Sequence, residues 1–170
     1  MSYYIRKITR AKWPEVDLEQ IKPENISADA ITGCIRTTSN KLSLWKVENT
    51  DDNLNNILPL ITGFDKPNRC EFVYISEKLI KDANIDLQQS SEDANTIFEN
   101  LNDTHYNAVV NDYKGLGVFA EIVVKSLGRY VRISEREVKD RLIQLIETGT
   151  INKKDLKDSM LMKLGYQIAS

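Results

Sequence analysis

The spacing of apolar residues changes along the chain, and it predicts strands in the first half and helices in the second. Segments 3–9, 41–47 and 70–75 are rich in β-branched and aromatic residues, and their apolar side chains fall on one or both faces of an extended chain. After residue 100, apolar residues recur every three or four positions, which is typical of helices. This separation of strands from helices favours an α+β fold over an alternating α/β fold.

The longest helical pattern runs from Asp103 to Gly128. Its apolar residues are Tyr106, Val109, Val110, Tyr113, Leu116, Phe119, Ile122, Val123 and Leu127. Asp103 or Thr104 can cap the start, and Gly128 can end the helix. A helix of about 24 residues would be about 36 Å long, enough to cross a small domain. Gly115 and Gly117 lie inside it and each weakens a helix by about 1 kcal/mol, so its continuity past them stays open.

Two shorter helical patterns complete the chain. Ser134 and Glu137 form a capping box that begins the first, and Asn152 begins the second. We therefore predict a small, mostly antiparallel sheet of three to four strands from the first half, packed on the long helix. Residues 1–133 would form this α+β core, and residues 134–170 would form a C-terminal helical hairpin of the same domain.

Composition narrows the class of protein. The chain has 170 residues, of which 41% are hydrophobic and 28% charged, as in a soluble globular domain. It has no apolar run near 18 residues and no apolar core of a signal peptide at its start. Cys34 and Cys70 do not make a disulfide framework, although the sequence leaves one bridge between them open, and apolar neighbours favour two buried thiols over a reactive one. We expect a cytoplasmic protein, away from membranes, with no cofactor and no metal.

The charge pattern favours a protein partner. The net charge is −2, whereas dedicated nucleic-acid binders usually carry a clear basic excess. Acidic residues gather in the middle of the chain, and residues 84–96 are expected to form a mobile loop. Asp82, Asp86, Glu92 and Asp93 could thus present carboxylates to a protein with a basic surface. The sequence therefore ranks a non-enzymatic protein-binding module first, such as a toxin-neutralising, immunity or defence-accessory protein. Homo-oligomers are compatible with this hypothesis.

A nucleic-acid-associated regulator is the second hypothesis. The C-terminal hairpin has the length of a helix-turn-helix unit. Its candidate contacts to nucleic acid are Arg129, Arg132, Arg136, Lys153 and Lys154. Acidic residues between them weaken this positive field, so a solvated hairpin is the preferred interpretation. The alternative predicts binding that falls steeply with salt.

A small hydrolase-like enzyme is the third hypothesis. His105 is the only histidine, and it could act as a general base with Asp103 or Asp112. Most histidines are structural, and no companion motif accompanies this one, so the sequence leans towards a protein that is not an enzyme. The turn Arg36–Asn40 combines a guanidinium with hydroxyl groups that could hold an anion, although such residues are common in turns.

Overall fold

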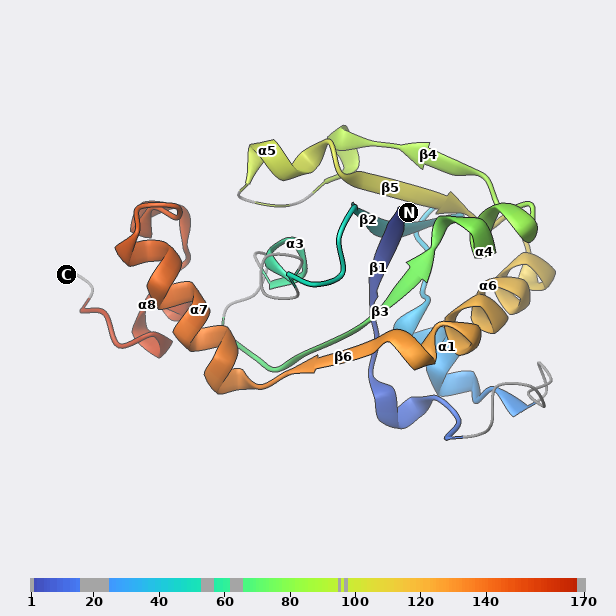
Figure 1. Ribbon diagram of the computed structural model, residues 1–170, viewed down its shortest axis with the longest axis horizontal. Coiled ribbons are helices and arrows are strands. Elements are labelled where there is room, and N and C mark those ends of the chain that lie inside the picture. Colours follow the sequence, from blue (N-terminus) through green and yellow to red (C-terminus); the bar gives the residue numbers. More distant parts are fainter. Residues whose placement is uncertain are drawn as a thin grey trace.

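The computed structural model describes residues 2–15, 25–52, 57–61, 66–94, 96 and 98–167, and an antiparallel sheet lies at the centre of this part of the chain (Figure 1). Among the described residues the sheet has six strands in the order β4-β5-β2-β1-β3-β6, and each neighbouring pair is antiparallel. The strands are β1 (Tyr3–Lys7), β2 (Lys41–Val47), β3 (Cys70–Ser76), β4 (Leu87–Gln89), β5 (His105–Val109) and β6 (Tyr130–Ile133).

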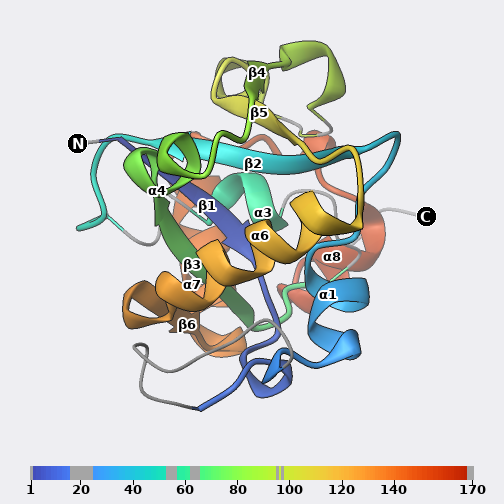
Figure 2. The ribbon, with the colours of Figure 1, turned by 90° about the vertical axis from the view of Figure 1, so that its right-hand side faces the viewer.

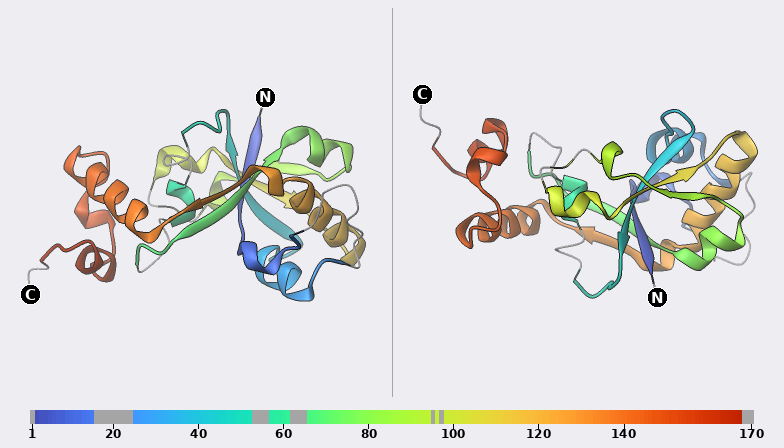
Figure 3. Two further views of the ribbon diagram at one scale, coloured as in Figure 1. Left: turned by 60° about the horizontal axis from the view of Figure 1, so that its bottom comes forward. Right: turned by 90° about the horizontal axis from the view of Figure 1, so that it is seen from above.

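Helices cover both faces of the sheet (Figure 2). The helices are α1 (Ala28–Cys34), α3 (Leu58–Ile61), α4 (Glu77–Asp82), α5 (Glu99–Asn102), α6 (Tyr113–Lys125), α7 (Glu135–Glu147) and α8 (Asp158–Lys163). On one face, α1, α4 and α6 enclose an apolar cluster that includes Leu44, Val73 and Phe119. On the other face, α3, α7 and α8 enclose a second cluster that includes Phe72 and Leu142. Figure 3 shows α7 and α8 at the end of the molecule opposite α4 and α6.

Strand β3 shows why two covered faces produce a run that is apolar at nearly every position. Cys70, Phe72 and Tyr74 belong to the cluster with α7, while Val73 and Ile75 belong to the cluster with α6. Every residue from Cys70 to Ile75 is buried, including Glu71. A strand buried on both sides needs apolar residues at successive positions, and the alternation seen in half-exposed strands disappears.

The α+β class agrees with the sequence prediction, but the predicted architecture is wrong. The sheet has six strands among the described residues, not three to four, and the last of them extends to Ile133. Strands are therefore not confined to the first half. Residues 84–96, expected to be a mobile loop, contribute the edge strand β4 and the 3-10 turn Ser91–Asp93, although residue 95 lies outside the described residues.

The predicted helix from Asp103 to Gly128 is wrong in its first part. His105–Val109 is strand β5, paired with β2 so that Asn107 lies opposite Ser43. Helix α6 begins only at Tyr113 and then continues through both glycines. Asp112 is the residue that caps it, because its carboxylate accepts a hydrogen bond from the N–H of Gly115 at 2.7 Å.

The C-terminal segment packs on the sheet through apolar side chains. The predicted capping box is present, with Ser134 and Glu137 bonded to each other's backbone N–H at the start of α7. Val138, Leu142 and Met160 join the cluster that contains Phe72. The proposed division between residues 1–133 and 134–170 stays a prediction. None of the helices in the described part of the chain has the length and apolar character needed to cross a membrane.

The two cysteines are buried in different apolar clusters. Cys34 lies with α1 and α6, and Cys70 lies on the opposite face of the sheet with α7. Both thiols are free. Burial raises the pKa of Cys70 to about 11, so this thiol stays protonated at neutral pH.

Candidate functional site

A polar cavity opens where the pairing between β1 and β2 ends. The two strands pair from Tyr3 and Val47 as far as Ile5 and Trp45, although both continue beyond that point. The cavity has a volume of about 380 Å³. Its lining is polar throughout and consists of Arg6, Arg36, Thr38, Ser39, Lys41, Ser43, Asp93, His105 and Asn107.

Arg6 bridges the strands at this point. Its Nε donates to the backbone carbonyl of Cys34 at 2.9 Å, and its Nη1 donates to the backbone carbonyl of Ser43 at 2.7 Å. Burial lowers the pKa of Arg6 to about 10, which leaves the guanidinium charged at neutral pH. Arg6 therefore replaces a missing part of the β1–β2 ladder and also brings a positive charge to the cavity.

Ser43 and His105 form a hydrogen-bonded pair in the cavity wall. The Ser43 Oγ lies 2.6 Å from the Nε2 of His105, and the Nδ1 of the same ring lies 2.7 Å from the backbone carbonyl oxygen of Ser90. A carbonyl oxygen can only accept, so Nδ1 carries a proton, and when that is the ring's one proton Nε2 accepts from the Ser43 hydroxyl. A histidine oriented in this way can take the proton of a serine nucleophile.

The environment of His105 holds the ring in place. The side chain is only 2% exposed. Trp45 packs against it edge to face, with ring centroids 4.8 Å apart. Its two neighbours in the hydrogen-bond chain come from different segments, because Ser43 belongs to β2 and Ser90 follows β4. The sheet thus assembles a serine, a histidine and a carbonyl that are far apart in the sequence.

Asp93 fixes the segment that supplies the Ser90 carbonyl. Its Oδ2 accepts hydrogen bonds from the Ser90 hydroxyl at 2.6 Å, from Lys41 Nζ at 3.2 Å and from Asn107 Nδ2 at 2.7 Å. These hydrogen bonds, the one from Ser90 first, lower the pKa of the Asp93 carboxyl to about 2. The ionised carboxylate therefore ties Ser90 to strands β2 and β5 without touching His105 directly.

The turn Arg36–Asn40 forms one rim of the cavity. Thr38 and Lys41 exchange backbone hydrogen bonds of 3.0 and 2.9 Å around a two-residue hairpin turn. Ser39 and Asn40 both have left-handed backbones, with φ of 51° and 61°. This is the geometry of a type I′ turn, which asparagine and glycine adopt readily and serine does not. Arg36, Thr38 and Ser39 line the polar cavity, whereas Thr37 and Asn40 line a neighbouring one.

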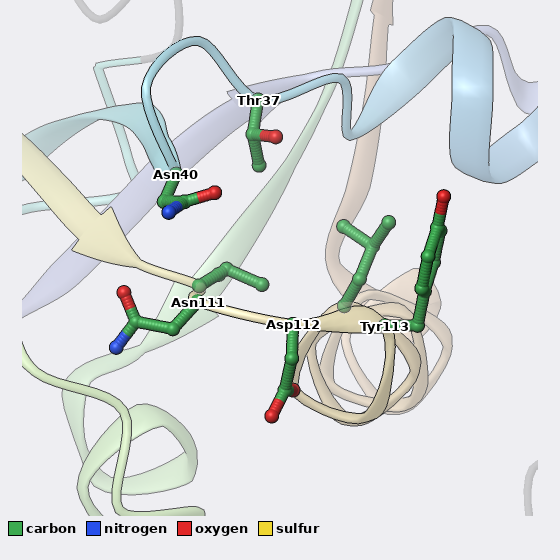
Figure 4. A pocket seen from close by; sticks show the side chains of 7 residues that line it. Thr37, Asn40, Asn111, Asp112 and Tyr113 are labelled. Atoms are coloured by element: carbon green, nitrogen blue, oxygen red, sulfur yellow. The ribbon is translucent and has the colours of Figure 1, made fainter.

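The neighbouring cavity lies beside the start of α6 (Figure 4). It has a volume of about 310 Å³, and its lining contains neither lysine nor arginine. Tyr113 stands at its edge with its side chain 93% exposed. Figure 4 shows the Asp112 carboxylate turned away from Thr37 and Asn40, as its role in capping α6 requires.

The structure brings together some of the residues singled out in the sequence and separates others. His105, Asp93 and the rim turn share one cavity. Asp112 lines the neighbouring cavity, and Asp103 lines a third one, so neither predicted acidic partner of His105 lies in its cavity. Sequence reasoning missed Ser43 and Ser90. The signal available in the sequence was the polar Ser43 between Leu42 and Leu44 in the clearest predicted strand.

Most of the other predicted binding residues interact within the chain. In the acidic group, Asp82 pairs with Lys78 and Asp86 accepts from Gln88, while Glu92 is exposed. In the basic group, side chains contact neighbours as follows: Arg132 with Glu71, Arg136 with Asp140, Arg129 over the ring of Tyr3, and Lys153 over the ring of Tyr166. Lys154 is exposed.

The chemistry of the polar cavity suits an anion better than a metal. Its lining combines guanidinium, ammonium, hydroxyl and amide groups with one imidazole and one carboxylate, and the described part of the chain contains no group of three or more histidine, cysteine or carboxylate side chains placed to hold a metal ion. Comparison with known proteins adds no relative, because no family model, curated protein or solved structure matches the chain.

Proposed function

We propose that this protein is a small hydrolase of ester substrates, in which Ser43 is the nucleophile and His105 the general base. One observation carries the proposal, the hydrogen-bond chain from the Ser43 hydroxyl through the His105 ring to the Ser90 carbonyl. A serine hydroxyl is a weak nucleophile at neutral pH, and an adjacent base held in the correct tautomer is the usual means of activating it. The geometry thus favours the hypothesis that the sequence ranks third.

The cavity supports this assignment, because a merely structural Ser–His hydrogen bond has no need of one. Ser43 and His105 both contribute to the wall of a 380 Å³ cavity, a volume that suits a small ligand. Three cationic side chains, those of Arg6, Arg36 and Lys41, line the same space. The guanidinium of Arg6, which is held at the Ser43 backbone carbonyl, would help to stabilise the oxyanion that forms when a carbonyl is attacked.

The proposed reaction has two steps. In the first, Ser43 Oγ bonds to the substrate carbonyl carbon, and its proton moves to His105 Nε2. The tetrahedral intermediate then expels the alcohol, which takes that proton. In the second step, His105 Nε2 takes a proton from water while the water oxygen bonds to the acyl carbon. The bond from that carbon to Ser43 Oγ then breaks, Ser43 Oγ takes the proton back from His105, and the acid product leaves. The Ser90 carbonyl accepts the Nδ1–H throughout and stabilises the transient imidazolium.

A fluorophosphonate reagent tests the nucleophile directly. The expected reaction forms a bond between Ser43 Oγ and phosphorus, breaks the phosphorus–fluorine bond, releases fluoride and transfers the hydroxyl proton to His105. Intact mass and peptide mapping should locate one adduct on Ser43. Ser43→Ala should abolish the adduct, His105→Gln should slow its formation, and Ser159→Ala in α8 should leave the rate unchanged. An adduct that persists in Ser43→Ala, or an unlabelled but folded wild-type protein, would contradict the proposal.

The two binding hypotheses stay predictions. Three of the four acidic residues proposed for a toxin-neutralising, immunity or defence-accessory role make hydrogen bonds or ion pairs within the chain. Co-purification at low and high salt distinguishes these hypotheses from the hydrolase. A protein retained at a fixed ratio in both salts would support a protein partner, and nucleic acid lost at high salt would support the C-terminal basic residues.

A further inference from the structure

We infer that the substrate of this cavity carries an anionic group, a phosphate or a carboxylate, that Arg36 binds together with the hydroxyls of Thr38 and Ser39. That this anionic group belongs to a substrate rests on the proposed hydrolase function. The binding site itself rests on a different set of residues from the Ser43–His105 pair, so the two proposals can fail separately.

The balance of charge in the cavity supports an anionic ligand. Its lining contains the cations Arg6, Arg36 and Lys41 and the single carboxylate of Asp93. Lys41 is bonded to Asp93, which leaves the charges of the two arginines uncompensated among the lining residues. The excess positive charge would attract an anion and would repel a cationic ligand.

The two arginines have different roles. Arg6 is half-buried and donates to two backbone carbonyls, which fixes its position at the end of the β1–β2 pairing. Arg36 is exposed at the rim, and no described residue forms a hydrogen bond or ion pair with it. A planar guanidinium can donate two parallel hydrogen bonds to a carboxylate or phosphate, so Arg36 is the cation available to a ligand.

The rim turn adds hydroxyl donors beside Arg36. Thr38 and Ser39 are both exposed and both line the cavity. Ser39 adopts a left-handed backbone that glycine would occupy without strain, yet the chain places a hydroxyl there. The neighbouring cavity at Tyr113 shares this turn but has no cation in its lining. The anionic group is therefore assigned to the cavity that also holds Ser43.

Titration of inorganic phosphate and of acetate into Ser43→Ala protein tests this inference without interference from turnover. Calorimetry gives the affinity, and backbone amide shifts of residues 36–41 report the location. We expect saturable binding that shifts these amides. Arg36→Gln should weaken it by about tenfold or more, because a charge-assisted hydrogen-bonding partner is lost. Arg136→Gln, a change in an arginine on the exposed face of α7, is the matched control and should bind like the parent.

The outcomes separate the two proposals. Binding of neither anion, or equal binding by Arg36→Gln and Arg136→Gln, would overturn the anionic subsite. If Ser43 is labelled by the fluorophosphonate in that case, the hydrolase proposal survives without it. Arg36-dependent binding in a protein whose Ser43 is never labelled would retain the anion site and overturn the hydrolase.

Discussion

Two charged clusters in this molecule resemble each other in composition but differ in whether their side chains line the polar cavity. At the start of β3, the buried Glu71 is 7% exposed and accepts a hydrogen bond from the backbone N–H of Arg10 at 3.0 Å. Its carboxylate also lies 3.5 Å from the Nε of Arg69 and 3.9 Å from that of Arg132. In the polar cavity, Asp93 likewise accepts hydrogen bonds from three donors. Ser43 and Arg36 also line this cavity, so a ligand could reach them.

The difference teaches that a concentration of charge is not by itself a sign of function. Around Glu71 the arginines and the carboxylate interact with one another. Removing one of these side chains should chiefly lower the free energy of unfolding. Around His105 the carboxylate positions a segment, while Ser43, His105 and Arg36 line a cavity in which the proposed reaction and anion binding would take place. Substitutions in the two clusters should therefore separate activity from stability.

The largest expected effect is the loss of hydrolysis in Ser43→Ala. Without the nucleophile, turnover of an activated anionic ester should fall by about 10⁴-fold. The free energy of unfolding should fall by only about 1 kcal/mol, because one hydrogen bond to His105 is lost. Initial rates and urea unfolding measure the two effects. Unchanged turnover would remove Ser43 from the mechanism.

The reverse result is expected for Glu71→Ala. Loss of the buried carboxylate leaves the Arg10 N–H without its acceptor, so the free energy of unfolding should fall by about 2 kcal/mol. Turnover per folded molecule should stay the same. Denaturant unfolding and active-site titration check these outcomes, with the exposed Glu92→Ala as control. A large fall in turnover at full folding would show that this cluster too is functional.

Ser39→Gly is expected to have two smaller effects, a gain in stability and a loss of phosphate affinity. Relief of the left-handed backbone should stabilise the protein by about 1 kcal/mol, while loss of the hydroxyl should weaken phosphate binding severalfold. Asn40→Gly is the matched control, since asparagine tolerates this conformation and faces the other cavity. Thermal unfolding and calorimetry measure both quantities, and phosphate binding equal to wild type would exclude the Ser39 hydroxyl from the subsite.

The smallest expected effect concerns acid stability. The pKa of Asp93 is lowered from 3.8 to about 2, so its ionised form stabilises the folded state above about pH 4, and this contribution disappears as the pH falls towards 2. Asp93→Asn should remove this part of the pH dependence. Urea unfolding between these pH values measures it, with Asp86→Asn as control. Identical pH profiles for wild type and Asp93→Asn would contradict the assignment.

The sequence predicts the three central strands of the sheet and the start of α7 better than the strands nearer the sheet edges. Strands β1, β2 and β3 lie within or close to the predicted segments, and Ser134 caps α7 as expected. Strand β5 is predicted wrongly as a helix because one of its faces carries buried polar residues, His105 and Asn107. The apolar residues Tyr106 and Ala108 on the other face are too few to show a period of two. Polar residues at buried strand positions break the local pattern where they line the cavity.

The candidate site could be predicted only in part for a related reason. A lone histidine and a turn rich in hydroxyls are visible in the sequence, but 62 positions separate His105 from Ser43. Only the pairing of β2 with β5 brings them together. Asp103 and Asp112 are nearer to His105 in sequence, yet strand geometry and the capping of α6 place them elsewhere. Proximity along the chain was therefore a poor guide to the partners.

The most direct test of the account is the protonation state of His105. The chain has one histidine, so a two-bond proton–nitrogen correlation spectrum contains a single imidazole and needs no assignment between rings. At neutral pH, we predict that Nδ1 carries the proton and that Nε2 is an unprotonated acceptor whose nitrogen shift changes in Ser43→Ala. A proton on Nε2, or a ring unaffected by Ser43→Ala, would contradict the activation of Ser43 by His105.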